Sequence, residues 1–138
     1  MNEYLTSRGS ALDDYLTLFG RIALSLMYLS SGWMKVGGYA ATAQYMQSAG
    51  VPSGLLPLVI IVELAGGLGI LFGCLTRWAA LGLALYTILA AALFHSHFTD
   101  QNQMIHFWKN VSIMGGFLIL AAHGGGRFSI DSWRARKR

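Results

Sequence analysis

Four long apolar runs, separated by shorter polar segments, dominate the chain from about residue 15 onward. A helix needs about 20 apolar residues to cross a hydrocarbon layer of ~30 Å. The pattern therefore predicts four membrane-spanning helices, at Tyr15 to Met34, Leu55 to Phe72, Trp78 to Phe94 and His106 to Ala122. Consecutive spans joined by short connections favour an up-down bundle. We expect an all-α membrane protein whose single domain comprises residues 1–138.

The connection between the first two runs contains apolar residues at three- and four-residue spacing. Gly37-Gly38 precedes this segment, and the breaker-rich stretch Gly50 to Gly54 follows it. This pattern predicts a short amphipathic helix at Tyr39 to Ala49. We expect it to lie at the membrane interface and to cover one mouth of the bundle.

The composition supports a membrane environment and excludes several kinds of site. Hydrophobic residues make up 54% of the chain and charged residues only 12%, whereas a soluble domain carries about 25% charge. The single cysteine, Cys74, excludes an intramolecular disulfide and a CxxC redox pair. The polar start, with Glu3 and Arg8, does not resemble a cleavable signal peptide. The net charge of +4 is concentrated in the tail, Arg127 to Arg138, which favours anionic lipid head groups over nucleic acid as its partner.

Lysine and arginine residues beside the spans predict the orientation in the membrane. These residues gather in cytoplasmic loops. If both termini are cytoplasmic, the opposite side carries only Lys35 and Lys109. The cytoplasmic side would then carry seven, which are Arg8, Arg77, Arg127, Arg134, Arg136, Lys137 and Arg138. The sequence therefore predicts a multi-pass membrane protein with both termini in the cytoplasm.

Two charged residues fall deep inside predicted spans. Glu63 is at the centre of the second run, and Arg21 is in the first. A charge in the middle of a span costs at least about 2.5–3.5 kcal/mol, so each needs a partner. From the predicted span ends, their depths are ~12 and ~15 Å. We therefore expect Arg21 and Glu63 to form a pair, which either holds the bundle together or also touches a ligand or a proton path.

A second polar set is expected toward the outer face of the membrane, on the side away from the two termini. It consists of Trp33, Lys35, His95, His97, His106, Lys109 and Asn110. These side chains either bind the head of a ligand, such as a quinone-like ring or an anion, or anchor the helices at the interface. The histidines lack a helical i, i+4 pair, so no metal site is predicted.

Several short motifs, in their order along the chain, resemble the DoxX-like family of bacterial inner-membrane proteins, and within it the YqjF-type branch. The motifs are Ser31-Gly32-Trp33-Met34-Lys35, Gly50-Val51-Pro52, Glu63-Leu64-Ala65-Gly66-Gly67, Gly73-xx-Thr76-Arg77, Phe94-His95, Trp108-Lys109-Asn110 and the closing stretch Gly124 to Asp131. The resemblance implies a four-span bundle linked to quinone or sulfur redox metabolism. It also implies polar intramembrane positions at Arg21, Lys35, Glu63, Lys109 and Asn110.

These observations favour a redox-associated protein that binds a quinone or another small lipophilic ligand, without a cofactor of its own. Any catalysis would belong to a membrane quinone-linked oxidoreductase of which this chain is a subunit. The expected ligand-binding residues are Arg21, Glu63, Lys35, Trp33, His95, Lys109 and Asn110. One alternative is a non-enzymatic assembly or stabilising subunit, in a homo-oligomer or with a redox partner protein. Another is a proton or solute pathway, which the nearly apolar third run disfavours.

Overall fold

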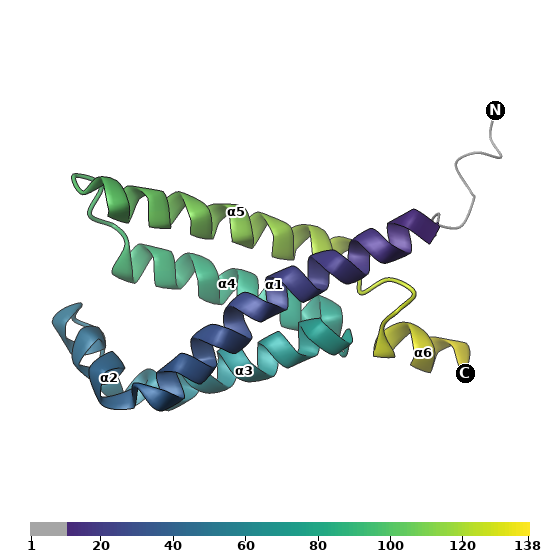
Figure 1. Ribbon diagram of the computed structural model, residues 1–138, viewed down its shortest axis with the longest axis horizontal. Coiled ribbons are helices and arrows are strands. Elements are labelled where there is room, and N and C mark those ends of the chain that lie inside the picture. The colour runs from purple at the N-terminus through teal and green to yellow at the C-terminus, as the bar shows by residue number, and fades with distance from the viewer. Residues whose placement is uncertain (1–10) are drawn as a thin grey trace.

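The computed structural model describes residues 11–138, and this part of the chain contains helices and no strand. The predicted all-α class is therefore confirmed. Residues 1–10, with Glu3 and Arg8 of the polar lead, lie outside the described residues. The elements in Figure 1 are α1 (Ala11–Gly37), α2 (Tyr39–Ser48), the short 3-10 helix η1 (Ser53–Leu55), α3 (Leu56–Phe72), α4 (Thr76–Phe94), α5 (Gln101–His123) and α6 (Ile130–Arg136).

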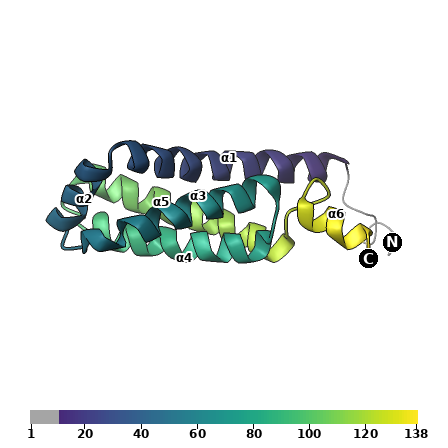
Figure 2. The same cartoon turned by 90° about the horizontal axis from the view of Figure 1, so that it is seen from below.

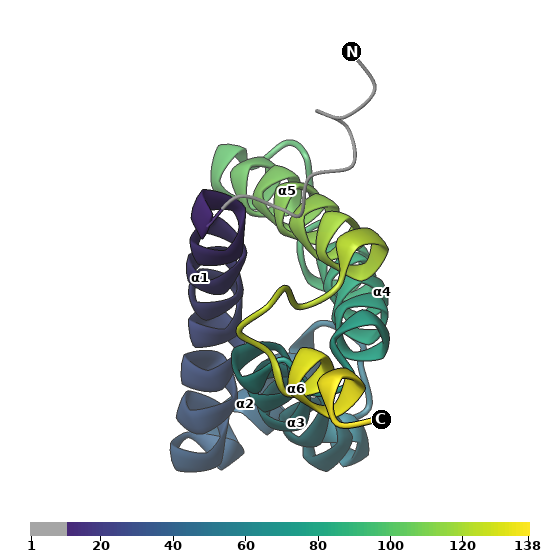
Figure 3. The ribbon, with the colours of Figure 1, turned by 90° about the vertical axis from the view of Figure 1, so that its right-hand side faces the viewer.

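Helices α1, α3, α4 and α5 run side by side in alternating directions (Figure 2). Viewed end-on, they follow one another around the bundle axis in the order α1, α3, α4, α5 (Figure 3). Helix α1 packs along α3, and α4 packs along α5, whereas α1 and α5 touch only slightly. Where the helices meet, the core is built around Tyr28, Ile70, Leu83 and Phe117. The molecule therefore consists of two tightly packed helix pairs, joined mainly between α3 and α4.

Glycines set the close approach of α1 to α3. A Cβ atom added to Gly32 would lie 2.8 Å from the side chain of Leu64, and one added to Gly67 would lie 2.9 Å from that of Leu29. Small residues allow two helix backbones to pack closely in lipid. These two contacts fix which residues of α1 lie opposite which residues of α3.

Three of the described helical segments are long and apolar enough to cross a bilayer, namely Ser53–Phe72, Thr76–Phe94 and Gln101–His123. They agree with the second, third and fourth predicted spans. Helix α1 has 27 residues, or ~40 Å, but Arg21 within its apolar stretch lowers its hydropathy. That α1 also crosses the bilayer, as the first predicted span, therefore stays a prediction.

Capping explains where the helices differ from the prediction. Helix α5 begins at Gln101 rather than His106, because the side chain of Asp100 accepts a hydrogen bond from Asn102 N at 2.9 Å. Helix α6 was not expected in the basic tail. Ser129 caps it by accepting a hydrogen bond from Ser132 N at 3.1 Å. The short helix after α1 is present as α2, and its location at the membrane interface stays a prediction.

Candidate functional site

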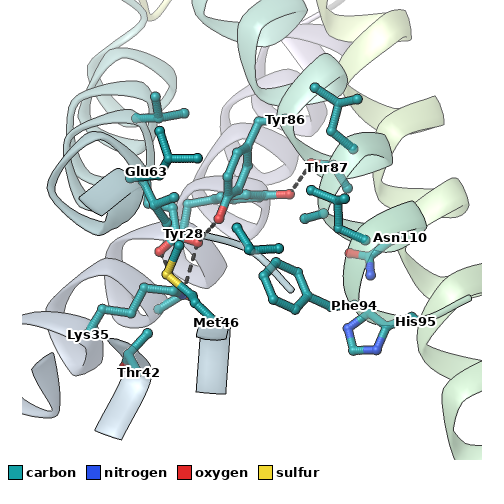
Figure 4. Close-up of a pocket in the computed structure, with 18 of the residues that line it drawn as sticks. Tyr28, Lys35, Thr42, Met46, Glu63, Tyr86, Thr87, Phe94, His95 and Asn110 are labelled. Atoms are coloured by element: carbon teal, nitrogen blue, oxygen red, sulfur yellow. Dashed lines mark hydrogen bonds and ion pairs between the residues drawn. The ribbon is translucent and has the colours of Figure 1, made fainter. Parts of the chain in front are cut away.

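A cavity of about 640 Å³ lies between the two helix pairs, toward the end of the bundle that carries α2 (Figure 4). Its walls are mostly apolar side chains of α3 and α4, among them Leu58, Val62 and Leu93. Helix α2 contributes the buried Met46, and the ring of Tyr45 stacks on Phe94 with 5.4 Å between centroids. A mostly apolar cavity of this size is typical of small-molecule sites, which measure about 300–1,000 Å³.

One wall of the cavity carries a buried carboxylate. Glu63 is 3% exposed. Lys35 Nζ lies 3.0 Å from both of its carboxylate oxygens and donates a further hydrogen bond to Ser31 Oγ at 2.6 Å. Tyr86 Oη donates to Glu63 Oε1 at 2.6 Å (Figure 4). This ion pair with its two hydroxyl groups satisfies the charge that the sequence placed in the middle of a span.

The helix geometry brings this network together. Ser31 and Lys35 are one turn apart on α1 and share a face. Gly32 lies between them, and a Cβ atom there would be 3.3 Å from Glu63 Cβ. The close approach of α1 to α3 therefore places the lysine within reach of the carboxylate, while α4 supplies Tyr86 from the other side.

A second polar contact crosses the cavity. Tyr28 of α1 hydrogen-bonds the hydroxyl of Thr87 on α4. The ring of Tyr28 lies edge-on to Tyr86 and Phe117, with centroids 6.2 and 5.4 Å away. This contact links the two helix pairs where α1 and α5 barely touch.

The rim near the start of α5 carries imidazoles and an amine. The rings of His95 and His106 stack with 5.1 Å between centroids, and His95 Nδ1 lies 2.8 Å from Gln103 Oε1. Asn110 Nδ2 donates to the carbonyl of His106 at 3.0 Å. Lys109 also lines the cavity, and within residues 11–138 its amine has no hydrogen bond or ion pair.

The predicted pairing of Arg21 with Glu63 is wrong. Lys35 is the partner of Glu63, and Arg21 Nη2 instead donates to the carbonyl of Phe128 at 2.8 Å. Since Gly32 lies opposite Glu63, Arg21 is eleven residues, or ~16 Å, farther along α1. The depths of Arg21 and Glu63, when counted from the predicted span ends, therefore did not show how α1 and α3 are aligned along their length.

Arg21 is 1% exposed and sits where α3 ends. Gly73 ends α3 with φ +66°, and a Cβ atom added to Gly73 would collide with Arg21 Nη1. The guanidinium therefore lies near the C-terminal, partly negative end of α3, which favours a cation. Its Nε and Nη1 have no hydrogen-bond partner among the described residues. Arg21 does not line the cavity.

Asp131 holds the C-terminal segment to the turn between α3 and α4. Its carboxylate accepts hydrogen bonds from Leu75 N at 2.8 Å, and from the amide and hydroxyl of Thr76 at 2.8 and 2.7 Å. Burial on its own would raise the pKa of Asp131. The hydrogen bonds from Thr76 and Leu75 and the charge of Arg134 outweigh burial, so the pKa lies below the ordinary carboxyl value.

The cavity thus collects five of the seven expected ligand-binding residues, which are Lys35, Glu63, His95, Lys109 and Asn110. Arg21 lies elsewhere, and Trp33 is 72% exposed and does not line the cavity. Sequence reasoning missed Tyr86 and Thr87 as site residues. They are the only hydroxyl-bearing residues between Trp78 and Phe94, and that isolation was the available signal. In the part of the chain that the structure describes, no cluster of three His, Cys, Asp or Glu residues could hold a metal.

Comparison with known proteins places the chain in a family. Residues 16–96 match the DoxX family. The chain is 50% identical to the inner membrane protein YqjF of Escherichia coli over 120 residues, covering 87% of this chain and 92% of the relative. It is 39% identical to the inner membrane protein YphA of Escherichia coli over 124 residues, covering 84% of this chain and 88% of the relative.

A more distant match is CatD of Bacillus subtilis, which is named as a candidate oxidoreductase. It is 31% identical over 77 residues, or 56% of this chain and 57% of the relative. None of the solved structures compared matches this chain. The family match and the two inner-membrane relatives agree over most of the sequence. The chain therefore belongs to the DoxX family of membrane proteins.

Proposed function

We propose that this chain binds a small lipophilic molecule of the quinol or quinone class in its cavity, as a redox-associated subunit in the bacterial inner membrane. The observation that carries the proposal is the hydrogen-bonded carboxylate of Glu63 on the wall of an otherwise mostly apolar cavity of about 640 Å³. A polar group that binds a ligand head beside apolar walls is the usual composition of a small-molecule site.

The network favours a ligand that donates a hydrogen bond. Lys35 Nζ makes three contacts, to Ser31 Oγ and to both oxygens of Glu63, so its three donors are in use. Glu63 Oε1 accepts from both Lys35 and Tyr86, whereas Oε2 accepts from Lys35 alone. A carboxylate oxygen has two acceptor sites. A quinol hydroxyl could therefore donate to Oε2 without breaking any bond of the network.

The redox part of the proposal rests on relatives. CatD is named as a candidate oxidoreductase, and the match to it covers little more than half of either chain. We therefore propose that this protein holds the quinol or quinone, and that a separate redox protein exchanges electrons with it.

We further propose that α1 is a fourth span and that both termini are cytoplasmic. Both cations of α1 within the bundle contact other parts of the protein. Arg21 is buried beside the end of α3, and Lys35 is paired with Glu63. Exposed cations gather at the α6 end of the bundle, where they are Arg77, Arg127, Arg134, Arg136, Lys137 and Arg138. This asymmetry supports a cytoplasmic location for that end.

The binding test uses purified protein in lipid nanodiscs titrated with decylubiquinol and decylubiquinone. We expect saturable binding to the wild type, and at least tenfold weaker binding to Glu63→Gln. Ser112→Ala, which removes a hydroxyl of α5 outside the cavity, should bind like the wild type. Negligible binding of both compounds to the wild type and to Glu63→Gln would reject the proposal.

An assembly subunit without a ligand is the second candidate. One observation favours it, because the Lys35–Glu63 pair joins α1 to α3 and the Arg21–Phe128 contact joins α1 to the C-terminal segment. On that account, substitutions in the network would lower the yield and change the oligomeric state in step, with no ligand-dependent stabilisation of the wild type.

A further inference from the structure

We infer that the cavity also has an anion subsite, at the rim formed by His95, His106 and Lys109, which takes the anionic head of an amphipathic molecule. The inference rests on the proposed ligand-binding function and names a second ligand class for this cavity, distinct from the neutral quinol or quinone head at Glu63. It follows from the distribution of charge around the cavity.

The charges on the cavity wall do not cancel. Glu63 is the only acid that lines the cavity among the described residues, and Lys35 neutralises it at 3.0 Å. The nearest acid in sequence to the rim, Asp100, does not line the cavity and caps α5 by accepting from Asn102 N at 2.9 Å. The remaining amine, that of Lys109, is therefore left without a counter-charge.

The rim is already arranged to receive an anion. Gln103 holds one ring nitrogen of His95 at 2.8 Å, and the ring of His95 stacks on that of His106. Within the described residues Lys109 has no protein partner, so its three N–H donors are available. An ammonium group at the edge of a mostly apolar cavity attracts an anion more strongly than one in bulk solvent.

The spacing of polar groups requires an amphipathic ligand. Tyr86, which contacts Glu63, and His95 at the rim are nine residues apart along α4, or ~14 Å. The α4 wall between them that lines the cavity is mostly apolar, with Leu89, Ala90 and Leu93. A head at the rim would therefore be followed by an apolar body that extends along this wall toward Tyr86.

Interfacial anchoring alone would explain an exposed lysine near a helix end, because lysine amines commonly reach toward the head-group region. Anchoring does not require Lys109 to line a cavity beside a stacked pair of imidazoles. It also predicts no preference among ligands, whereas an anion site does. The two accounts can therefore be separated by experiment.

The test compares three probes with the same alkyl chain, namely decanoate, decanol and decylammonium. Binding to protein in nanodiscs would be measured by the shift in thermal midpoint and corrected for partition into empty nanodiscs. We expect decanoate to bind at least tenfold more tightly than decanol, and decylammonium to bind least. Lys109→Gln should remove the preference for decanoate and leave decanol binding unchanged. Arg77→Gln, which removes an exposed cation outside the cavity, should keep the preference.

Equal binding of decanoate and decanol to the wild type would overturn the inference, as would a preference that survives in Lys109→Gln. If Lys109→Gln does not yield folded protein, His106→Gln takes its place, with a smaller loss of the preference expected. Binding of decylubiquinol without any preference for decanoate would leave the proposed function in place and remove only the anionic head. If neither decylubiquinol nor any alkyl probe binds, the proposed function itself is rejected.

Discussion

Lys35 and Glu63 form the ion pair that joins α1 to α3 inside the bundle, with Lys35 Nζ 3.0 Å from each carboxylate oxygen. The pair lies on the cavity wall and is completed by Ser31 and Tyr86. Any ligand in the cavity would therefore meet a group that also holds two helices together. Stability and ligand binding should be linked at this position.

Removing only one member of the pair should be worse than removing both. Lys35→Met leaves a carboxylate with 3% exposure without its cation, and breaking a buried pair in this way costs about 3 kcal/mol or more. The double variant Lys35→Met with Glu63→Leu should recover most of that loss, because no buried charge remains. Thermal midpoints in one detergent would measure this. Additive losses in the double variant would show that the two residues do not interact.

The hydroxyl of Tyr86 should contribute to stability through Glu63. Tyr86→Phe removes a hydrogen bond of 2.6 Å to the carboxylate, and hydrogen bonds to charged groups are worth about 1.5–3 kcal/mol. We expect a loss in that range in an unfolding titration. Tyr39→Phe, at an exposed position of α2 outside the cavity, is the matched control and should behave like the wild type. A loss of equal size in both variants would argue against the contact.

Gly73 should be the least replaceable glycine at the α6 end of the bundle. It adopts φ +66°, and a Cβ atom there would collide with the buried guanidinium of Arg21. The left-handed conformation alone costs a non-glycine residue about 1–2 kcal/mol, so Gly73→Ala should lose more than that. Gly82→Ala in α4 meets nothing within 4 Å and should be neutral or slightly stabilising. Similar thermal midpoints for the two variants would contradict the close packing of Arg21 against Gly73.

Asp131 should make stability depend on pH in the acid range. Its folded-state pKa lies below the ordinary carboxyl value, which is about 3.9. Its contribution to stability is therefore present at higher pH and is lost as the pH falls through the folded-state pKa. The difference in thermal midpoint between pH 7 and acid should shrink in Asp131→Asn. An unchanged pH profile in that variant would show that the hydrogen bonds from Thr76 and Leu75 to residue 131 do not depend on the charge of the carboxylate.

Reporter fusions should show an even number of membrane crossings. Alkaline phosphatase, which is active only outside the cytoplasm, should be inactive when fused after Arg138 and active when fused after Gly50 or Ser96. Green fluorescent protein after Arg138 should fluoresce. Active phosphatase at the C-terminus would show that α6 faces the periplasm, and would remove the proposed orientation.

The hydrophobic pattern alone located the long helices and part of the candidate site. Three helices match the predicted spans within a few residues. Inside a bilayer there is no water, so the backbone N–H groups of a long apolar run can bond only to carbonyl groups of the same run. The same pattern marked Glu63 as a charge that needs a partner. It also placed Lys35, His95 and Asn110 at one end of the bundle, where the cavity lies.

Only the tertiary structure decided which charges meet. The first two long helices are joined through α2, and this connection does not set their relative height. Packing of Gly32 on Leu64 and of Gly67 on Leu29 sets it. That register brings Lys35 to Glu63 and leaves Arg21 at the end of α3, beside Phe128. Helix formation follows from residues that are near one another in the chain, whereas the pairing of charges depends on how far one helix slides along another.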